Sequence, residues 1–311
     1  MNPTIGSYFA GIGGICKGFQ DAGFKILYAN EMDPKCAISY KHNHPNINLL
    51  EQDIYDLDLL TIPYTDGIVG GFPCQPFSLA GNLKGLKDVR SNVFFRLSEI
   101  IELKKPKFIL LENVSNLLSI NNGKDFGIIK DTLESIGYSL KYKVLSSNKH
   151  ANIPQSRDRL FIVGFLDSEK RDKFEFPDEI PLITKVVDII DQTVQQNPKY
   201  YYDTTSQYYN QLNTAIDDNK TVYQIRRIYV RKNKSYLCPT LTANMGGGGH
   251  NVPIIKDNFG IRKLTPSECF SFQGYSGFKI IVSDTNAYKQ AGNSVTVPLI
   301  ERIANNIMEI L

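Results

Sequence analysis

Two spacings of apolar residues alternate along the first half of the chain. Short apolar runs with the length of buried β-strands occur at Thr4–Phe9, Ile26–Asn30, Gly67–Gly70, Phe108–Leu111, Tyr142–Leu145 and Leu160–Phe165. Between these runs, apolar residues recur at helical spacing over Ile15–Ala22, Pro34–His44, Val93–Leu103 and Phe126–Ile136. This alternation predicts an α/β fold, with an open, mostly parallel sheet and helices on both of its faces.

The pattern changes after Leu166. From there to about Asn258 the chain is rich in Tyr, Asn, Gln and Asp and only weakly periodic, which indicates a smaller, loop-rich module. Helical spacing returns at Pro266–Phe272 and Val297–Ile310, and we expect the last helix to pack against the first domain. The predicted organisation is a first domain at 1–166, a second at 167–260, and a return segment at 261–311 that completes the first.

The composition is that of an ordinary globular protein. The 311 residues are 42% hydrophobic and 22% charged, which suffices for a core without disulfide support. The five cysteines include no CxxC pair, so we expect neither a metal site nor a disulfide framework. The chain shows no signal peptide and no apolar run of membrane-spanning length, so a cytoplasmic protein without membrane contact is expected.

One short stretch of the second domain is basic, whereas the net charge of the whole chain is only +3. Two tyrosines, Tyr229 and Tyr236, lie among its five basic residues, which are Arg226, Arg227, Arg231, Lys232 and Lys234. No acidic residue separates them. Two interpretations are open, a solvated strand or loop and a surface that contacts the phosphates of a nucleic acid.

A glycine-rich turn, YFAGIGG at Tyr8–Gly14, joins the first predicted strand to the first helix. Such turns bring the backbone close to bound nucleotides, although a simple tight turn shares the pattern and the G-x-G-x-x-G spacing is absent. Glu31 ends the next strand about twenty residues later, where an acid accepts from ribose hydroxyls. Asp53, farther on, is placed to accept from the amine of adenine. Together these features suggest an adenosine-bearing cofactor.

Cys74 follows the apolar run at Gly67–Gly70 and lies between two prolines, Pro73 and Pro76. The prolines restrict the backbone of this loop, and the carboxyl edge of a parallel sheet is where open α/β folds place their sites. A packing cysteine is usually set among aliphatic residues, whereas the neighbours here are Gly, Pro, Gln and Ser. The setting therefore favours a nucleophile, which acts as the thiolate.

Three further polar residues end or begin predicted strands. Glu112 follows the run FILL and is expected on the same sheet edge as Cys74, where it could act as an acid or base, a helix cap or a surface acid. Arg157 and Arg159 precede the run LFIVGF, and their alternation places both guanidinium groups on one face of a strand. A basic strand end at the protein surface is the other interpretation of this pair.

Taken together, these residues resemble the DNA cytosine-5 methyltransferases, in particular the small bacterial enzymes of type II restriction–modification systems. The resemblance covers nearly the whole chain, and its motifs stand in the family's order. They are F-x-G-x-G-G at Phe9–Gly14, Glu31, Asp53, G-F-P-C-Q-x-F-S at Gly71–Ser78, E-N-V at Glu112–Val114, Q-x-R-x-R at Gln155–Arg159, R-K-L-T-x-x-E at Arg262–Glu268, and Q-x-G-N-S-V at Gln290–Val295.

The resemblance implies S-adenosylmethionine as cofactor, S-adenosylhomocysteine as product, and a Rossmann-like doubly wound sheet. Glu31 then binds the ribose, Asp53 and Ile54 contact the adenine, and Met32 packs against it where many relatives have tryptophan. The remaining implied cofactor residues are Phe9, Ala10, Gly11, Ile12, Gly13, Gly14, Gly71, Pro73, Asn293, Ser294 and Val295.

The resemblance also implies the reaction. Carbon 5 of cytosine is a poor nucleophile, and attack by Cys74 at carbon 6 turns it into an enamine carbon. The resemblance assigns Glu112 to stabilise the charge on the ring and Arg159 to orient the base, with Arg157 also in the catalytic group. This chemistry cannot occur inside a stacked duplex, so the base must be flipped out.

By the same resemblance, the module at 167–260 recognises a short sequence in duplex DNA, and Gly247 and Gly248 belong to a glycine-rich recognition loop. The implied DNA contacts are Gln75, Ser78, Arg90, Arg226, Arg227, Arg231, Thr240, Gly247 and Gly248. The family also implies a monomer that protects host DNA from a cognate restriction endonuclease without forming a stable complex with it.

Three other functions share part of this pattern. A transfer-RNA cytosine-5 methyltransferase has the same architecture, but those relatives have little variable region, and this chain has a large one. A catalytically silent DNA-binding homologue would not need Cys74, Glu112, Arg157 and Arg159. A nicotinamide dehydrogenase fits the glycine turn but leaves the P-C-Q and E-N-V motifs unexplained.

Overall fold

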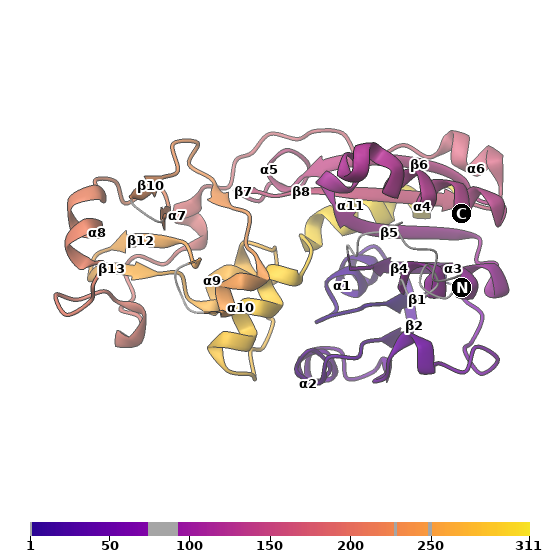
Figure 1. Ribbon diagram of the computed structural model, residues 1–311, viewed down its shortest axis with the longest axis horizontal. Coiled ribbons are helices and arrows are strands. Elements are labelled where there is room, and N and C mark those ends of the chain that lie inside the picture. Colours follow the sequence, from indigo (N-terminus) through magenta and orange to yellow (C-terminus); the bar gives the residue numbers. More distant parts are fainter. Residues whose placement is uncertain (1, 74–92, 227–228, 248–250) are drawn as a thin grey trace, which may run out of the picture. The chain divides into compact units, whose positions relative to one another are not determined.

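The computed structural model describes residues 2–73, 93–226, 229–247 and 251–311, which form two compact units (Figure 1). The first comprises Met1–Leu145, Asp158–Pro177 and Leu299–Leu311, and the second comprises Ser146–Arg157 and Asp178–Pro298. These units differ from the predicted segments, because residues 146–157 and 261–298 belong to the second unit. The chain thus passes between the units four times, at 145/146, 157/158, 177/178 and 298/299.

The first unit is built on a seven-stranded sheet with the order β3-β2-β1-β4-β5-β8-β6 (Figure 1). Its strands are β1 (Thr4–Tyr8), β2 (Lys25–Asn30), β3 (Asn48–Leu50), β4 (Gly67–Gly71), β5 (Phe108–Val114), β6 (Ser139–Ser146) and β8 (Asp158–Phe165). The pairs from β3 across to β5 are parallel, and β8 runs antiparallel to β5. The predicted α/β class is confirmed. The antiparallel pair of β5 and β8 is a departure from a parallel sheet.

The helices of this unit begin and end close to the predicted residues, except the one at Ser168–Lys173, where no helix was predicted. They are α1 (Gly14–Asp21), α2 (Pro34–Asn43), α3 (Val93–Lys104), α4 (Lys124–Ser135), α6 (Ser168–Lys173) and most of α11 (Val297–Met308). Asp33 caps α2, since its Oδ1 accepts from the amide of Lys35 at 2.8 Å, and Pro34 occupies the first turn. A Cβ on Gly18 of α1 would lie 2.6 Å from Cβ of Ile300, so α11 packs closely on α1 as predicted.

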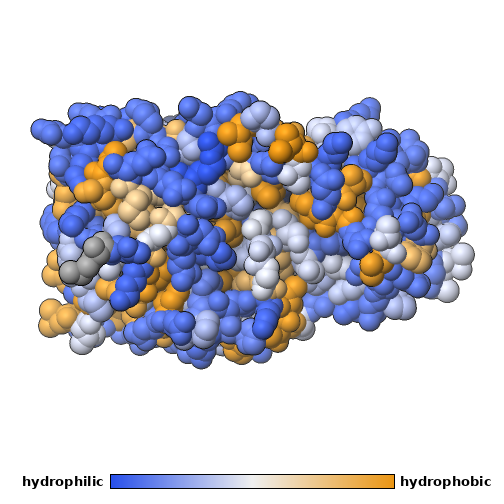
Figure 2. All heavy atoms as spheres, turned by 180° about the vertical axis from the view of Figure 1, so that it is seen from behind, coloured by the Kyte–Doolittle hydropathy of each residue, from blue (hydrophilic) through white to orange (hydrophobic). Residues whose placement is uncertain are grey.

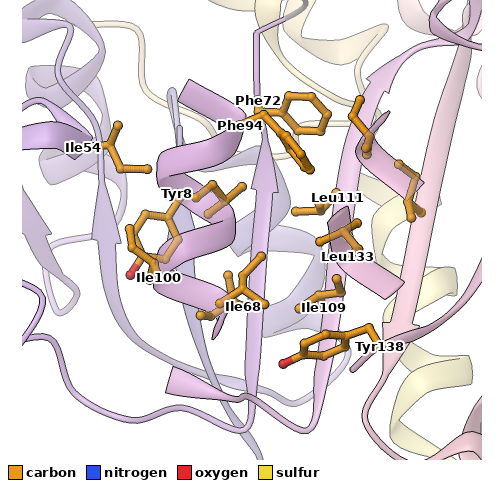
Figure 3. Close-up of a cluster of buried hydrophobic side chains, with 14 of the residues drawn as sticks. Tyr8, Ile54, Ile68, Phe72, Phe94, Ile100, Ile109, Leu111, Leu133 and Tyr138 are labelled. Atoms are coloured by element: carbon orange, nitrogen blue, oxygen red, sulfur yellow. The ribbon is translucent and has the colours of Figure 1, made fainter. Parts of the chain in front are cut away.

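The core of the first unit lies where α3 and α4 cover β1, β4 and β5 (Figure 3). Tyr8, Ile68, Ile109 and Leu111 point from the strands toward Phe94 and Ile100 of α3 and Leu133 of α4 (Figure 3). Phe72, just beyond β4, contacts Phe94 with ring centroids 5.4 Å apart. The same cluster includes Ile54, so a loop residue after β3 is anchored in the core.

The second unit contains a four-stranded sheet with the order β10-β9-β12-β13. The strands are β9 (Tyr223–Ile225), β10 (Val230–Lys232), β12 (Ile254–Asp257) and β13 (Gly260–Lys263), and their pairings are antiparallel. A two-stranded sheet pairs β7 (Gln155–Ser156) with β11 (Cys238–Pro239). The helices are α5 (Ser147–His150), α7 (Val186–Ile189), α8 (Tyr209–Ala215), α9 (Pro266–Ser271) and α10 (Asp284–Asn293).

A buried ionic cluster holds this second sheet to α9. The guanidinium of Arg262, fully buried in β13, contacts Oδ2 of Asp257 at 2.6 Å and both carboxylate oxygens of Glu268 at 2.7 and 2.8 Å. Glu268 also accepts from the amide of Thr265, which caps α9 in return. The R-K-L-T-x-x-E motif thus folds into one hydrogen-bonded network.

Polar residues predominate on the molecular face shown in Figure 2, with hydrophobic residues in small groups between them. The most exposed large apolar side chains of the described residues include Leu60, Ile183 and Met32. Within the described ranges, the helices are too short or too polar to cross a membrane. The same ranges hold no group of three or more His, Cys, Asp or Glu residues that could bind a metal ion.

Candidate active site

The predicted site residues of the first unit that the structure describes lie at one edge of the sheet. Because β1, β4 and β5 are parallel, their carboxyl ends lie side by side, with Tyr8 paired to Gly70 and Gly71 paired to Glu112. The chain leads outward in order from β1 to β2 and β3, then returns to place β4 on the other side of β1. Ligands of open α/β sheets bind at such a switch point, at the carboxyl ends of the strands.

The glycine turn after β1 contains three residues with positive φ. Phe9, Gly11 and Gly13 have φ values of 52°, 57° and 90°, in the left-handed region that favours glycine. The amide of Ala10 donates to Asn30 of β2 at 3.0 Å, which ties the turn to the sheet. Phe9 holds this conformation without being glycine, and such outliers concentrate at functional sites.

The two glycines face different surroundings. A Cβ on Gly13 would lie 2.1 Å from Nε2 of His44, whereas a Cβ on Gly11 would have no atom of the described residues within 4 Å. Gly13 therefore allows close packing inside the protein, and Gly11 borders open space. Ala10 and Ile12 are buried, and the carbonyl of Ala10 accepts from the amide of Gly13 at 2.8 Å, which closes the turn.

Glu31 is tied to the glycine turn by its own carboxylate. One oxygen accepts from the amide of Gly11 and the other from the amide of Asp33, both at 2.7 Å. Each carboxylate oxygen has two lone pairs, so both can accept a further hydrogen bond from a ligand hydroxyl. Met32, the next residue, is 63% exposed, which is unusual for a large apolar side chain beside a structured loop.

Asp53 and Ile54 lie after β3, where a short 3₁₀ helix, η1 (Ile54–Asp56), begins. Asp53 caps this helix, and its Oδ1 accepts from the amide of Tyr55 at 3.0 Å. Ile54 is 2% exposed and belongs to the core cluster. The backbone of this segment is thus anchored, and the half-buried Asp53 carboxylate stands at its start.

Glu112 and Arg159 form an ion pair at the end of β5. Nε of Arg159 lies 3.0 Å from Oε1 of Glu112, and the side chains are only 17% and 12% exposed. They are neighbours because β8 runs antiparallel to β5 and pairs Arg159 with Val114. A Cβ on Gly71 would lie 3.1 Å from the other Glu112 oxygen, so the carboxylate also lies close to the end of β4.

Asn113 fixes the start of the loop that carries Cys74. Its side chain is buried, and Nδ2 donates to the carbonyl of Phe72 at 2.9 Å. Gly71, Phe72 and Pro73 are the last described residues before that loop. Cys74, Gln75, Ser78 and Arg90 were predicted in the catalytic or DNA-contacting groups and lie outside the described residues, as do Arg227 and Gly248.

The two arginines of the Q-x-R-x-R motif have separate surroundings, contrary to the expectation that they share one strand face. Arg157 is 2% exposed, and its guanidinium donates to the carbonyls of Leu241, Gly292 and Ser294 in the second unit. Arg159 belongs to the first unit, where it pairs with Glu112. The physical reason is that the chain passes from one unit to the other between them, and β8 begins only at Asp158.

The other predicted residues of the second unit differ in exposure. Asn293 ends α10 and is exposed, whereas Ser294 and Val295 are buried. Gly247 is exposed. Thr240 is half-buried, and its hydroxyl donates to the carbonyl of Ser156.

One of the basic side chains in the stretch at 226–234 is already held in ion pairs within the protein. Nζ of Lys232 lies 2.8 Å from Asp217 and 3.4 Å from Asp218, because the loop before β9 folds back on β10. The ion pair with Asp217 raises the pKa of Lys232. Arg226 donates to the side-chain oxygen of Gln224, and Arg231 is exposed. Of the described basic residues of this stretch, Arg226, Arg231 and Lys234 are exposed.

Sequence reasoning missed two residues that support this edge of the sheet. His44 fills the space behind Gly13, and Arg96 of α3 donates to the carbonyl of Ile54 at 3.2 Å. Neither forms part of a local motif. A histidine at the end of a helix and an arginine on an amphipathic helix usually indicate a surface position, so the three-dimensional structure was needed to find both.

Comparison with known proteins assigns the family. The family model described as C-5 cytosine-specific DNA methylase matches residues 4–309. Type II methyltransferase M.Bsp6I of Bacillus sp. (strain RFL6) is 47% identical over 308 residues, which cover 97% of this chain and 98% of that protein. Type II methyltransferase M.DsaV of Dactylococcopsis salina is 35% identical over 302 residues, 96% of this chain and 84% of the relative.

Among solved structures, a DNMT2 mutant of Spodoptera frugiperda has a TM-score of 0.75 at 20% identity, covering 98% of this chain and 99% of that one. The Dnmt2 methyltransferase of S. pombe gives a TM-score of 0.75 at 19% identity, with 99% of both chains covered. At these identities the similarity shows the fold alone. The sequence matches decide the activity: the chain belongs to the C-5 cytosine-specific DNA methylases and is a DNA (cytosine-5)-methyltransferase.

Proposed function

We propose that this enzyme methylates carbon 5 of a flipped-out cytosine in a short duplex DNA sequence through a covalent Cys74 adduct, with S-adenosylmethionine as donor. The observation that carries the proposal is the Glu112–Arg159 pair at the end of β5, beside Gly71 at the end of β4. Cys74 follows Gly71 by three residues in the sequence. One edge of the sheet therefore carries the Glu112 carboxylate, the Arg159 guanidinium and the start of the segment that leads to Cys74.

The glycine turn and the following acids fit S-adenosylmethionine. Open space borders Gly11, the Glu31 oxygens retain lone pairs for ribose hydroxyls, and the exposed Met32 offers an apolar surface for a base. Asp53 begins an anchored turn from which its carboxylate can accept from an amine. When bound, S-adenosylmethionine supplies an electrophilic methyl group on a sulfonium centre. In our proposal Asn293, Ser294 and Val295 also belong to the cofactor residues.

Cys74 acts as the nucleophile in this proposal. Its thiolate adds to carbon 6 of the cytosine, the double bond between carbons 5 and 6 is lost, and carbon 5 gains the electron density of an enamine. After carbon 5 is alkylated, its proton leaves, the double bond re-forms and the thiolate is expelled. Burial raises the pKa of the Cys16, Cys238 and Cys269 thiols, so these three remain protonated at neutral pH.

Glu112 and Arg159 bind and polarise the cytosine ring. A carboxyl group hydrogen-bonded to ring nitrogen 3 stabilises the negative charge that develops when the thiolate adds. Arg159 holds that carboxyl group in place through its Nε contact, and the guanidinium has further N–H groups for the carbonyl oxygen of the base. Arg157 is assigned a supporting role instead, since its guanidinium holds three carbonyls of the second unit.

The second unit recognises duplex DNA in this proposal. Arg226 and Arg231 contact phosphates or guanine edges, Thr240 contacts a phosphate, and Gly247 lets the recognition loop approach the major groove. A base cannot be attacked at carbon 6 while it is stacked, so the target cytosine leaves the helix first. We also propose that the modification protects DNA from an endonuclease that cleaves the same sequence.

Bisulfite sequencing of DNA from cells that express the wild-type protein or Cys74→Ser tests the proposal. The wild type is expected to methylate cytosines within one short sequence. The serine variant is expected to methylate none and to keep its affinity for DNA, because the substitution removes the thiolate and little else. Methylation by Cys74→Ser would contradict the covalent mechanism, and dispersed methylation without a common sequence would contradict specific recognition.

A further inference from the structure

Arg96 of α3 reaches across to the segment that follows Asp53. Its Nε donates to the carbonyl of Ile54 at 3.2 Å, and one terminal nitrogen donates to the carbonyls of Leu57 and Tyr55 at 3.1 and 3.4 Å. The other terminal nitrogen pairs with Glu99 at 3.0 Å. One side chain thus binds three backbone carbonyls within a span of four residues.

The Arg96–Glu99 pair differs from an ordinary surface ion pair in the exposure of its two side chains. The Arg96 side chain is 19% exposed, whereas Glu99 is 55% exposed, so the guanidinium points inward and the glutamate lies outside it. Two of the three contacted residues are themselves anchored, because Ile54 and Leu57 are 2% and 4% exposed and belong to the core cluster, whereas Tyr55 is 41% exposed. In Figure 3, Ile54 lies on the side of the cluster next to α3 and Tyr8.

A planar guanidinium suits this task better than an ammonium group. It presents five N–H donors in a fixed fork, so several carbonyls that point toward one place are held in one geometry. The η1 turn has only three residues, and its first residue follows Asp53 directly. Holding the carbonyls of Ile54, Tyr55 and Leu57 therefore limits where the Asp53 carboxylate can lie.

We propose that Arg96 is a positioning residue for cofactor binding: it fixes the Asp53–Ile54 segment in the conformation that receives the adenine of S-adenosylmethionine. The inference rests on the proposed function, since it takes this segment as the adenine site. Arg96 does not touch the cytosine or the reacting atoms in this proposal. A segment fixed before binding has less conformational freedom to lose, so its effect belongs to cofactor affinity and not to the chemical step.

The test compares Arg96→Met, Arg96→Lys and the matched control Glu99→Gln. Methionine keeps an apolar stem without donors, lysine keeps one charged donor group, and the control removes the ion pair while leaving the carbonyl contacts. Calorimetry measures the affinity for S-adenosylhomocysteine, and steady-state kinetics on DNA separates KM for S-adenosylmethionine from kcat. Thermal unfolding records the stability of each variant.

We expect Arg96→Met to weaken binding about tenfold, in line with the loss of charged hydrogen bonds, and to raise KM by a similar factor. The kcat at saturating cofactor and the affinity for DNA are expected to stay at wild-type values. The cofactor affinity of Arg96→Lys should lie between those of the wild type and Arg96→Met. The affinity of Glu99→Gln should match that of the wild type. A purely structural residue would instead lower the melting temperature and the active fraction, with an unchanged dissociation constant.

Unchanged cofactor affinity in folded Arg96→Met or Arg96→Lys would overturn the inference, as would a loss of equal size in Glu99→Gln. These results are distinct from a failure of the proposed function. In that case the wild-type enzyme itself would not bind S-adenosylhomocysteine, and the comparison among variants would show no difference to explain.

Discussion

Glu112 takes its chemical role from its immediate neighbours. It is 12% exposed, lies 3.0 Å from Nε of Arg159, and sits beside the end of β4. Replacement by glutamine keeps the shape and the contact with Arg159 but removes the acidic group. We expect Glu112→Gln to lower kcat by about 10²- to 10⁴-fold, the usual contribution of an acid or base group. Single-turnover methylation assays measure this fall in rate, and the affinities for DNA and for the cofactor serve as controls. A variant with nearly wild-type turnover would contradict the assigned role.

His44 makes the stability of the glycine turn depend on pH. Burial, and to a lesser extent the charge of Lys17, lowers the pKa of His44, whose ring packs on Tyr40 with centroids 4.6 Å apart. Below the ordinary histidine pKa of about 6.5, His44 binds a proton in the unfolded chain but stays neutral in the folded protein. The free energy of unfolding therefore falls as the pH falls. His44→Phe keeps a ring behind Gly13 and should reduce this loss.

Urea unfolding of the wild type and His44→Phe at about pH 7.5 and about pH 5 checks the expectation, because the two values lie on either side of the histidine pKa. The wild type should lose more stability between them than the variant does. Equal losses in both proteins would show that His44 titrates normally and that the ring is not excluded from water.

The positions of single residues at the sheet edge were predictable where a local pattern marked them. Glu112, Asn113 and the acids after β2 and β3 end strands, and strand ends can be read from apolar runs. The different surroundings of Arg157 and Arg159 could not be predicted in this way. The two residues lie only two positions apart in one motif, yet they belong to different units. Arg96 and His44 act through contacts with residues 30 or more positions away, and no local spacing encodes such contacts.

The glycine turn offers a matched pair of substitutions that separates ligand binding from folding. Gly11→Ala introduces a methyl group into open space at a φ of 57°, at a strain of about 1–2 kcal/mol. Gly13→Ala adds a clash with the His44 ring to a φ of 90°. We expect Gly11→Ala to fold and lose cofactor affinity, and Gly13→Ala to lose more free energy of unfolding.

Calorimetry with S-adenosylhomocysteine and thermal unfolding measure the two effects. The double variant Gly13→Ala/His44→Ala is the control, because it relieves the clash but leaves the unfavourable φ in place. If Gly11→Ala bound the product as tightly as the wild type, the open space beside Gly11 would not belong to the cofactor site.

Most helices and strands of the first unit followed from sequence periodicity, because each buries one face in a large common core, whereas the three-residue β3 and the short α6 did not. The antiparallel direction of β8 did not follow, since a fully buried strand has the same apolar run in either direction. The strands of the second unit, such as β9 and β10 with three residues each, were also missed. Strands this short are specified by their partners rather than by their own pattern.

The second unit contains a buried ionic network beside its apolar core. Arg262 is fully buried between Asp257 and Glu268, and Tyr201 donates to the same Asp257 oxygen at 2.9 Å. Arg262→Met would leave two carboxylates buried without their cation, which typically costs about 3–5 kcal/mol. We expect the second unit to lose that stability while the first unit is little affected.

Hydrogen exchange followed by mass spectrometry resolves the two units in the same sample. Peptides from β12, β13 and α9 should exchange faster in Arg262→Met, and peptides from β1, β4 and β5 should exchange as in the wild type. A uniform increase in exchange would show that the two units unfold together, and no increase would show that the network is dispensable.

The division of the whole chain could be predicted only in outline. The change in composition after Leu166 marks the loop-rich module, but the compact second unit begins with Ser146–Arg157 and extends to Pro298. Those flanking residues have ordinary composition. They belong to the second unit through contacts such as Arg157 with Gly292 and Gln155 with Phe272, which join residues more than 100 positions apart.

Covalent trapping tests the central claim most directly. The target sequence found by bisulfite sequencing is made as a duplex with 5-fluorocytosine at the target position, because fluorine at carbon 5 cannot leave as a proton does. With S-adenosylmethionine present, we predict a denaturation-resistant adduct that mass spectrometry maps to Cys74, and we predict that Cys36→Ser still forms it. A wild-type enzyme that methylates normal DNA but forms no adduct, or an adduct at another residue, would contradict the account.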